Sequence, residues 1–423
     1  MSRSTGCWPR PVPAASIATP VSAASTPPAK GPSCSWERRN TDSTPPLPHP
    51  GSGVDRGGSM DTAVQVGQDP AVTRVNGGRW VERRRTPRDV AGYSRPEGRP
   101  VSAEPKLVYF FGQGRAEGTA AMKDVLGGKG AGLAEMVNIG IPVPPGFTIA
   151  ATMCLPYLES RSFPPRLREQ VDQALQRLEA ATGRSFGTPK NPLLVSVRSG
   201  AAVSMPGMME TILNLGLNDT TVAGLEKESG NAQFAWDSYR RFVQMFASVV
   251  FDLPKAPFDH MVEAKKEARK VERDIDLPAA DLKALVKDFK AHILAETGKA
   301  FPEEPTDQLW AAVTAVFESW NTRRAIDYRK LHGIDDAMGT AVNIVAMVFG
   351  NLGEDSGTGV AFSRDPSTGE GKLYGEYLLN AQGEDVVSGA RTPEPIETLH
   401  AKLPQAHEEL VRMARTLERH SAT

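Results

Sequence analysis

Hydrophobic residues recur with two different periods along this chain, and the change of period divides it into segments. Short apolar or alternating runs, which are typical of strands, occupy residues 106–111, 193–197, 341–349, 359–363 and 372–379. Between the second and third of these runs, from about residue 219 to 330, the spacing becomes helical. The pattern therefore predicts an α+β protein with a helical block inserted between two sheet-forming segments.

The helical block contains three apolar stripes, each on one face of a predicted helix. They are Phe234, Tyr239, Phe242, Val243, Phe246 and Val250; Leu282, Leu285, Val286, Phe289 and Ile293; and Leu309, Val313, Val316, Phe317 and Trp320. Thr306 is a candidate N-cap for the third helix, and another helix is expected over 132–139, ended by Gly140. The aromatic first stripe fits helix-on-helix packing better than a cofactor surface.

Residues 1–104 differ in composition from the rest of the chain. They hold 15 of the 34 prolines and few large apolar residues, so they bury too little surface to offset their ordering entropy. We expect this tail to be disordered. Its first 36 residues contain no Asp or Glu, which is typical of an organellar transit peptide; an extension without a role is the alternative.

Composition excludes several classes of protein. The formal net charge is −1, so no broad positive electrostatic field attracts nucleic acid. No apolar run approaches the ~18 residues that a membrane-spanning helix needs. The three cysteines are too scattered for a disulfide framework or a zinc site, and Cys154 is expected to pack in the core. Neither nucleic acid nor a membrane is expected as a partner, and the predicted location is cytoplasmic, with an organelle as the alternative.

Two motifs combine glycines with a cation, which suits phosphate binding. Residues 126–133 read Leu-Gly-Gly-Lys-Gly-Ala-Gly-Leu, where glycines allow close backbone approach, the following helix presents free N–H groups, and Lys129 adds a charge. In Ser-Val-Arg-Ser-Gly-Ala (196–201), Arg198 follows an apolar strand and is able to grip phosphate oxygens with two hydrogen bonds. A solvated lysine in a turn and a structural ion pair are equally compatible with these motifs.

Further segments carry candidate ligands. Gly207 lies in a small-residue loop that lets backbone amides approach a phosphate, while Gly-Glu-Asp-Ser-Gly-Thr-Gly-Val (353–360) is a glycine loop or a plain hairpin turn. Strand alternation places Glu376 on the face of Tyr374 and Leu378, among apolar neighbours. Its carboxylate then needs Mg²⁺, a ribose hydroxyl, a buried cation or a plain salt bridge. Together these motifs predict a nucleoside triphosphate site.

Six strings, in fixed order, resemble the pyruvate, phosphate dikinase family over about residues 105–420. They are Leu-Gly-Gly-Lys-Gly, Leu-Val-Ser-Val-Arg-Ser-Gly-Ala, Ser-Met-Pro-Gly-Met-Met, Ile-Leu-Asn-Leu-Gly-Leu-Asn, Tyr-Arg-Arg-Phe and Asn-Ala-Gln-Gly-Glu-Asp-Val-Val. The resemblance implies an ATP-grasp fold that binds ATP and Mg²⁺ and donates the β-phosphoryl group to a histidine on a separate domain. It also implies the overall conversion of ATP, pyruvate and phosphate into AMP, phosphoenolpyruvate and diphosphate.

The resemblance assigns roles to individual residues. It makes Lys129 and Arg198 phosphate-binding and catalytic, Gly207 part of a glycine loop, Arg241 a site-facing arginine of the helical block, and Thr358 and Gly359 part of a second loop over the phosphates. Glu376, Glu384 and Asp385 become nucleotide- and metal-side carboxylates, and the backbone from Met347 to Phe349 meets adenine. Val345 departs from the family pattern, in which a glutamine is expected.

The resemblance also organises the chain. After the tail of 1–104, we expect a first ATP-grasp lobe over 105–218, the helical insertion over 219–330, and over 331–423 the remainder of the first lobe with an incomplete second lobe. The chain is expected to stop before the phosphorylated-histidine domain and the pyruvate-binding barrel. It should therefore bind ATP weakly, be inactive alone and form a homodimer only when complete. The alternatives are a non-catalytic nucleotide-binding fragment and a water dikinase such as phosphoenolpyruvate synthase.

Overall fold

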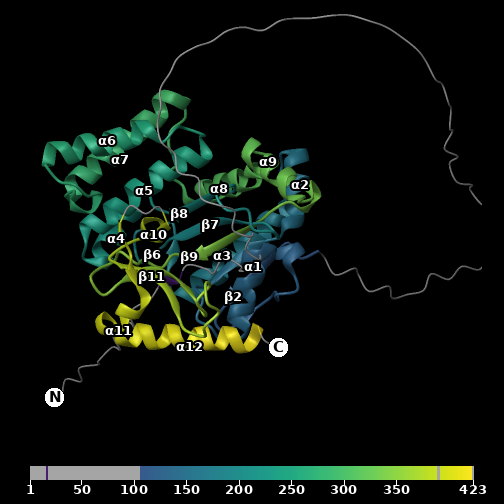
Figure 1. Cartoon of the computed structure of the whole chain (residues 1–423). Coiled ribbons are helices and arrows are strands. Elements are labelled where there is room, and N and C mark those ends of the chain that lie inside the picture. Colours follow the sequence, from purple (N-terminus) through teal and green to yellow (C-terminus); the bar gives the residue numbers. More distant parts are fainter. Residues whose placement is uncertain (1–15, 18–104, 388–390, 422–423) are drawn as a thin grey trace, which may run out of the picture. The chain divides into compact units, whose positions relative to one another are not determined.

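The computed structural model describes residues 16–17, 105–387 and 391–421, and within them the chain forms two larger β-sheets and a two-stranded one (Figure 1). The first sheet has the order β3-β2-β4-β9-β7-β8, and every neighbouring pair in it is antiparallel. The second sheet has the order β1-β10-β11-β12. With helices on and between these sheets, the predicted α+β class is confirmed.

The strands of the first sheet are β2 (Val108–Gly112), β3 (Arg115–Ala116), β4 (Gly146–Ile149), β7 (Val195–Gly200), β8 (Thr211–Leu215) and β9 (Ala341–Ala346). Those of the second are β1 (Ser16–Ile17), β10 (Gly357–Phe362), β11 (Tyr374–Leu379) and β12 (Glu394–Pro395), and β5 (Ser185–Phe186) pairs with β6 (Pro192–Leu193).

The helices are α1 (Lys123–Asn138), α2 (Cys154–Ser160), α3 (Pro165–Thr182), α4 (Thr221–Ser229), α5 (Ala232–Val250), α6 (Ala256–Arg269), α7 (Ala279–Thr297), α8 (Pro305–Ser319), α9 (Arg323–His332), α10 (Gly383–Val387), α11 (Leu399–Lys402) and α12 (Pro404–Ser421). The expected tail lies outside the described residues except for β1, which pairs in parallel with β10. The domain boundaries at 104, 218 and 330 stay predictions.

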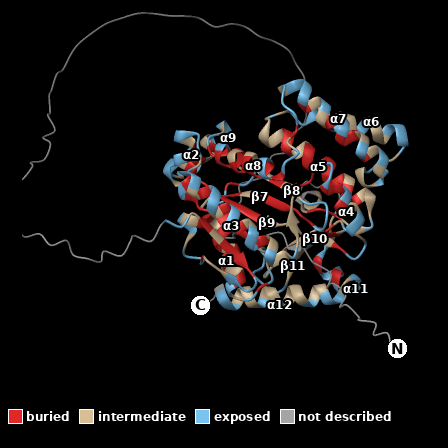
Figure 2. Cartoon of the chain, turned by 180° about the vertical axis from the view of Figure 1, so that it is seen from behind, coloured by how far each residue is buried: buried red, intermediate tan, exposed pale blue. Residues whose placement is uncertain are grey.

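Alternation along the central strands gives the first sheet one apolar and one polar face. In β7, Val195 and Val197 point to the apolar face, where side chains of α3 and α8 complete the core. Ser196 and Arg198 point the other way. Phe147 of β4 and its partner Ile344 of β9 are fully buried on the apolar side, and Figure 2 shows β7 and β9 as largely buried strands.

The helical block follows the predicted stripes. Helices α5, α7 and α8 bury the apolar residues expected of them, except that Val250 is only partly buried and that Trp320, although buried, directly follows α8. Helix α5 begins where the Asn231 side chain accepts a hydrogen bond from the backbone N–H of Phe234 at 3.0 Å. The predicted cap Thr306 is wrong, because α8 begins one residue earlier, at Pro305, with Glu304 as its N-cap residue. In both views, α6 and α7 lie on the opposite side of the sheets from α12 (Figures 1 and 2).

Helix α1 begins earlier than expected and contains the glycine motif. Gly127 interrupts it with a left-handed backbone (φ 67°, ψ 172°), so a second helical segment starts directly before Lys129. A Cβ atom on Gly127 would lie 1.5 Å from the carbonyl oxygen of Gly200, and the next amide, of Gly128, donates to the carbonyl of Ala201 at 2.9 Å. Only glycine allows this contact between α1 and the end of β7.

The contact at Gly127 predicts that Gly127→Ala destabilises the protein. The left-handed backbone alone costs about 1–3 kcal/mol for a side-chain-bearing residue, and the clash with Gly200 adds to this cost. Chemical denaturation followed by circular dichroism should show a lower midpoint than for the wild type.

Gly132→Ala is the matched control, because Gly132 also lies in α1 but a Cβ there would meet nothing within 4 Å. This variant should gain about 0.5–1 kcal/mol from improved helix propensity. Equal midpoints for Gly127→Ala and the wild type would contradict the structural role of Gly127.

Candidate functional site

A cavity of about 180 Å³ lies where the polar face of the first sheet meets α1 and the segment leading to the second sheet. We call it the cationic cavity, because its only charged lining residues among those described are Lys129 and Arg198. Its apolar lining consists of Leu133, Met136, Ile141, Pro142, Val143, Pro144, Leu213, Val345, Ala346, Met347, Val348 and Phe349, and its polar lining of Ser196, Asn343, Asn351, Thr358 and Gln382, with Gly350 and Gly383 completing the wall. The cavity thus offers an apolar surface and an uncompensated positive charge.

The two cations reach the cavity from different elements. Lys129 comes from α1 just after the kink and is exposed, whereas Arg198 lies in β7 and is half-buried. Although the residue as a whole is exposed, protein atoms around the ammonium group remove part of its solvent, and this loss, together with the nearby positive charge of Arg198, lowers the pKa of Lys129 to about 8. Burial also lowers the pKa of Arg198. Both shifts express mainly the cost of removing solvent from a cation, and at Lys129 the like charge of Arg198 adds to that cost.

Several polar atoms at this cavity have no partner within the part of the chain that the structure describes. Five of them are Arg198 Nε, Asn343 Nδ2, Asn351 Oδ1, Thr358 Oγ1 and Gln382 Nε2. Buried polar groups are normally hydrogen-bonded, and an unsatisfied one costs about 1–3 kcal/mol. Their concentration around one cavity points to a polar ligand that supplies the missing partners.

Asn343 shows how the first sheet builds its part of the site. In β9 it lies directly opposite Arg198 on one side and opposite Thr148 on the other, so all three side chains share one face. The Thr148 hydroxyl donates to Asn343 Oδ1 at 2.9 Å, which leaves Nδ2 of Asn343 unpaired. The sequence patterns had not singled out Asn343, although an asparagine inside an apolar strand is itself a signal of a special environment.

The segment after β9 forms the apolar wall. Met347 was expected where the backbone meets adenine, and it does line the cavity, but its amide already donates to the carbonyl of Leu194 at 2.9 Å. Val345, which departs from the family pattern, also lines the cavity. This part of the wall therefore offers side-chain surface rather than a free amide of Met347.

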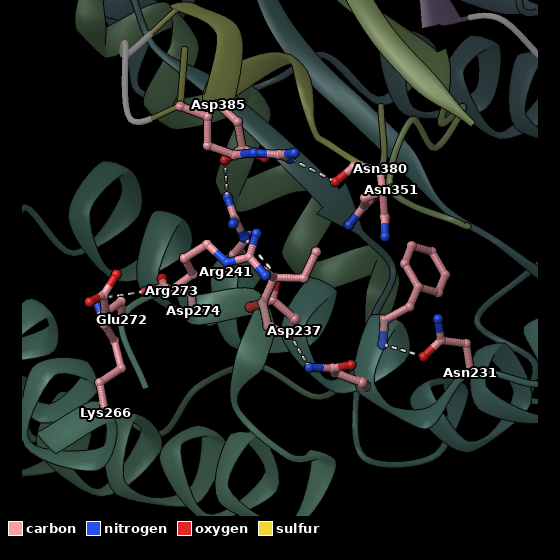
Figure 3. Close-up of a pocket in the computed structure, with 14 residues that line it drawn as sticks. Asn231, Asp237, Arg241, Lys266, Glu272, Arg273, Asp274, Asn351, Asn380 and Asp385 are labelled. Carbon is pink, nitrogen blue, oxygen red and sulfur yellow. Dashed lines mark hydrogen bonds and ion pairs between the residues drawn. The ribbon is translucent and has the colours of Figure 1, made fainter. Parts of the chain in front are cut away.

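A second cavity, of about 360 Å³, contains equal numbers of acidic and basic side chains, and we call it the mixed-charge cavity (Figure 3). Here Arg241 of α5 lies between two carboxylates: its Nε donates to Asp237 at 2.9 Å, and its Nη1 donates to Asp385 of α10 at 3.1 Å. Although burial alone would raise the pKa of Asp237, Arg240 and Arg241 hold it below its usual range. The predicted residues Arg241 and Asp385 thus tie the helical block to the second sheet.

Of the other predicted site residues, Gly207, Gly359 and Glu376 line neither cavity. Gly207 (φ 71°) lies in the loop between β7 and β8. Thr358 was expected in a loop, whereas Gly359 was expected both in that loop and at the start of the strand run 359–363. Both belong to β10, where they pair with Leu378 and Tyr377, and of the two only Thr358 lines the cationic cavity. Glu376 is exposed on β11, which corrects the expected apolar surroundings of its carboxylate. Glu384 lies in α10, and its side chain is outside the described part of the structure.

The described residues do not form a metal site of their own. Among them, no group of three or more His, Cys, Asp or Glu side chains is placed to hold an ion, and no carboxylate lines the cationic cavity. Asp385, a predicted metal-side carboxylate, is bound to Arg241 and to the amide of Gln382. This donor set does not fit protein-held Mg²⁺, which prefers several oxygen ligands in an octahedral arrangement.

Known proteins match most of this chain. The family model described as pyruvate phosphate dikinase, AMP/ATP-binding domain, matches residues 123–162 and 156–420. Pyruvate, phosphate dikinase 1, chloroplastic, of Oryza sativa subsp. japonica is 52% identical over 322 residues, which cover 76% of this chain and 34% of that protein. Pyruvate, phosphate dikinase of Rhizobium meliloti (strain 1021) is 52% identical over 328 residues, covering 74% and 36%.

A third relative, pyruvate, phosphate dikinase 2 of Zea mays, is 52% identical over 322 residues, covering 76% of this chain and 36% of that protein. The chain therefore spans about a third of the length of these curated relatives. No helix in the described ranges is long and apolar enough to cross a membrane. Since the family model matches well over half of the sequence, in agreement with the six motifs, this chain belongs to the pyruvate, phosphate dikinase family.

Proposed function

We propose that this chain is the ATP-binding part of a pyruvate, phosphate dikinase and that ATP binds in the cationic cavity. The observation that supports this proposal most strongly is the pair Lys129 and Arg198, which face the cavity without a carboxylate among its described lining residues. A triphosphate supplies the missing negative charge and accepts hydrogen bonds from both side chains. The apolar wall suits a base, since flat heteroaromatic rings gain from burial against aliphatic side chains.

The proposed mechanism is electrostatic. In phosphoryl transfer, catalysis rests on positioning and on stabilising the charge of the transferring group, and Lys129 and Arg198 are the groups of this chain that we assign to both tasks. The second helical segment of α1 starts directly before Lys129, so its N-terminal amides and dipole favour the same anion. Within an ATP-grasp fold, the β-phosphoryl group would pass to a histidine of a separate domain.

The remaining substrates belong to the complete enzyme. The relatives are named pyruvate, phosphate dikinases, so we propose pyruvate and phosphate as further substrates. The homodimer of the complete enzyme stays an expectation from the resemblance. Mg²⁺ is proposed only as an ion that accompanies the nucleotide, because the described residues do not hold it. A cytoplasmic location stays a prediction; the Oryza sativa relative carries the word chloroplastic in its name, which favours the organellar alternative for the tail.

Arg198→Ala should lower the affinity of the chain for ATP about 10- to 100-fold, because hydrogen bonds to charged groups contribute about 1.5–3 kcal/mol. Isothermal titration calorimetry on the 423-residue chain measures this change. Stability should fall little, since the variant removes an uncompensated charge.

Arg161→Ala is the matched control, because Arg161 forms a surface ion pair with Glu318 and lines neither cavity. Its ATP affinity should equal that of the wild type. If Arg198→Ala also binds ATP as the wild type does, then Arg198 is structural and the site is misplaced.

ATP affinity should fall as pH rises from about 7.5 to about 9.5, because the pKa of Lys129 is lowered to about 8 and only the protonated ammonium attracts phosphate. Solvent screens part of this shift at an exposed side chain, so we expect the midpoint of the decline at or slightly above pH 8.

The variant Lys129→Arg separates this titration from other effects of pH, since a guanidinium stays charged throughout this range. Its affinity should be nearly constant where that of the wild type declines. A wild-type affinity that does not change with pH would exclude Lys129 as a phosphate ligand.

A further inference from the structure

Three neutral polar side chains face the cationic cavity from the side of the second sheet; the resemblance expects Thr358 near the phosphates, and the other two have no role in the proposed binding of phosphate or base. They are Asn351, Thr358 and Gln382. Thr358 is only 4% exposed and Gln382 only 7%. Among the described residues, Oγ1 of Thr358, Nε2 of Gln382 and Oδ1 of Asn351 nevertheless have no hydrogen-bond partner. Each of these atoms carries a desolvation cost that a ligand would remove.

The backbone brings these three residues to one place. At Gly350, a Cβ atom would lie 2.4 Å from the carbonyl oxygen of Ala381 and 2.7 Å from that of Gly357, so three chain segments meet there. The amide of Ala381 donates to the carbonyl of Gly350 at 3.0 Å. Asn351 directly follows Gly350, Thr358 follows Gly357, and Gln382 follows Ala381. Close packing of the backbone at Gly350 therefore fixes how these three side chains lie relative to one another.

The position of Gln382 is fixed further by the ion pairs of the mixed-charge cavity. Asp385 Oδ2 accepts from the backbone N–H of Gln382 at 2.9 Å, while its Oδ1 accepts from Arg241. Asn351 lines both cavities, which places it at their common wall. The two amides are thus held at the border between the apolar wall and the more polar neighbouring space.

We infer that Asn351 and Gln382, with Thr358 beside them, bind the ribose hydroxyls of the nucleotide; this inference rests on the proposed function. The unpaired groups are an acceptor, Oδ1 of Asn351, and a donor, Nε2 of Gln382. A hydroxyl complements both, because it donates and accepts at once. A fully ionised phosphate group only accepts hydrogen bonds, so it leaves the Asn351 acceptor without a donor.

The same reasoning assigns the parts of the nucleotide to different walls. Lys129 and Arg198 take the phosphates, and the apolar wall, together with the aliphatic residues of α1 opposite it, takes the base. The amino group of adenine is the other donor in ATP that is able to reach Asn351. Inosine triphosphate, which lacks that amino group and keeps both hydroxyls, separates the two contacts.

Titration calorimetry with ATP, 2′-deoxy-ATP, 3′-deoxy-ATP and inosine triphosphate tests the inference on the whole chain. The wild type should bind at least one deoxy analogue about 3- to 10-fold more weakly than ATP, the effect of one neutral hydrogen bond. The variants Asn351→Ala and Gln382→Ala should bind ATP about 3- to 10-fold more weakly than the wild type does. They should also bind ATP and that deoxy analogue with equal affinity. Linear tripolyphosphate should bind these two variants as it binds the wild type, but Arg198→Ala more weakly.

Asn321→Ala and Gln405→Ala, both at exposed positions, are the matched controls and should keep the full preference for ATP. The inference fails if the Asn351 and Gln382 variants keep that preference, or if they lose a preference for ATP over inosine triphosphate instead. It also fails if their affinity for tripolyphosphate drops in parallel with that for ATP. If the wild-type chain binds ATP and its deoxy analogues equally, only this inference is refuted, whereas no ATP binding at all refutes the proposed function with it.

Discussion

Strand β7 pairs with β9 so that Arg198 lies opposite Asn343 and Val197 opposite Ile344. This register places the polar side chains of the central strands on one face and leaves the other face entirely to the core under α3 and α8. A slip by one residue would exchange the faces and send the guanidinium into that core. Burying an unpaired cation in the core would cost more free energy than any new strand pairing could contribute. Packing of the apolar face therefore fixes the site on the opposite face of the first sheet.

The two cavities show two ways of treating buried charge. In the mixed-charge cavity, Asp237, Arg241 and Asp385 compensate one another, and their bonds join the helical block to the second sheet. Removing one partner from such a network leaves an uncompensated charge, so each of these groups stabilises the contact. The roles of Arg241 and Asp385 toward a nucleotide stay predictions. In the cationic cavity, Lys129 and Arg198 have no such compensation among the described residues. The ion pairs of the mixed-charge cavity hold elements of the fold together, whereas the positive charge of the cationic cavity favours the binding of an anion.

Glycines connect these electrostatic features to the backbone. Gly127 lets α1 touch the end of β7 and thereby brings Lys129 to the cavity that Arg198 lines. Gly350 does the same for the second sheet, where it allows three segments to meet behind Asn351. In both places the absence of a Cβ atom sets the distance between elements that carry ligand-binding groups. The geometry of the site is therefore determined by two close backbone contacts rather than by long side chains.

The sequence by itself determined the fold class, the helical block and the family, because burial periodicity and short motifs are local properties. It also marked Lys129 and Arg198, whose glycine-rich neighbours are visible in the chain. Only the tertiary structure decided that Thr358 belongs to a strand, that Glu376 is exposed, and that Asn343 and Gln382 matter. Whether a polar atom has a partner depends on which distant segments come within hydrogen-bonding reach, and no local pattern records that.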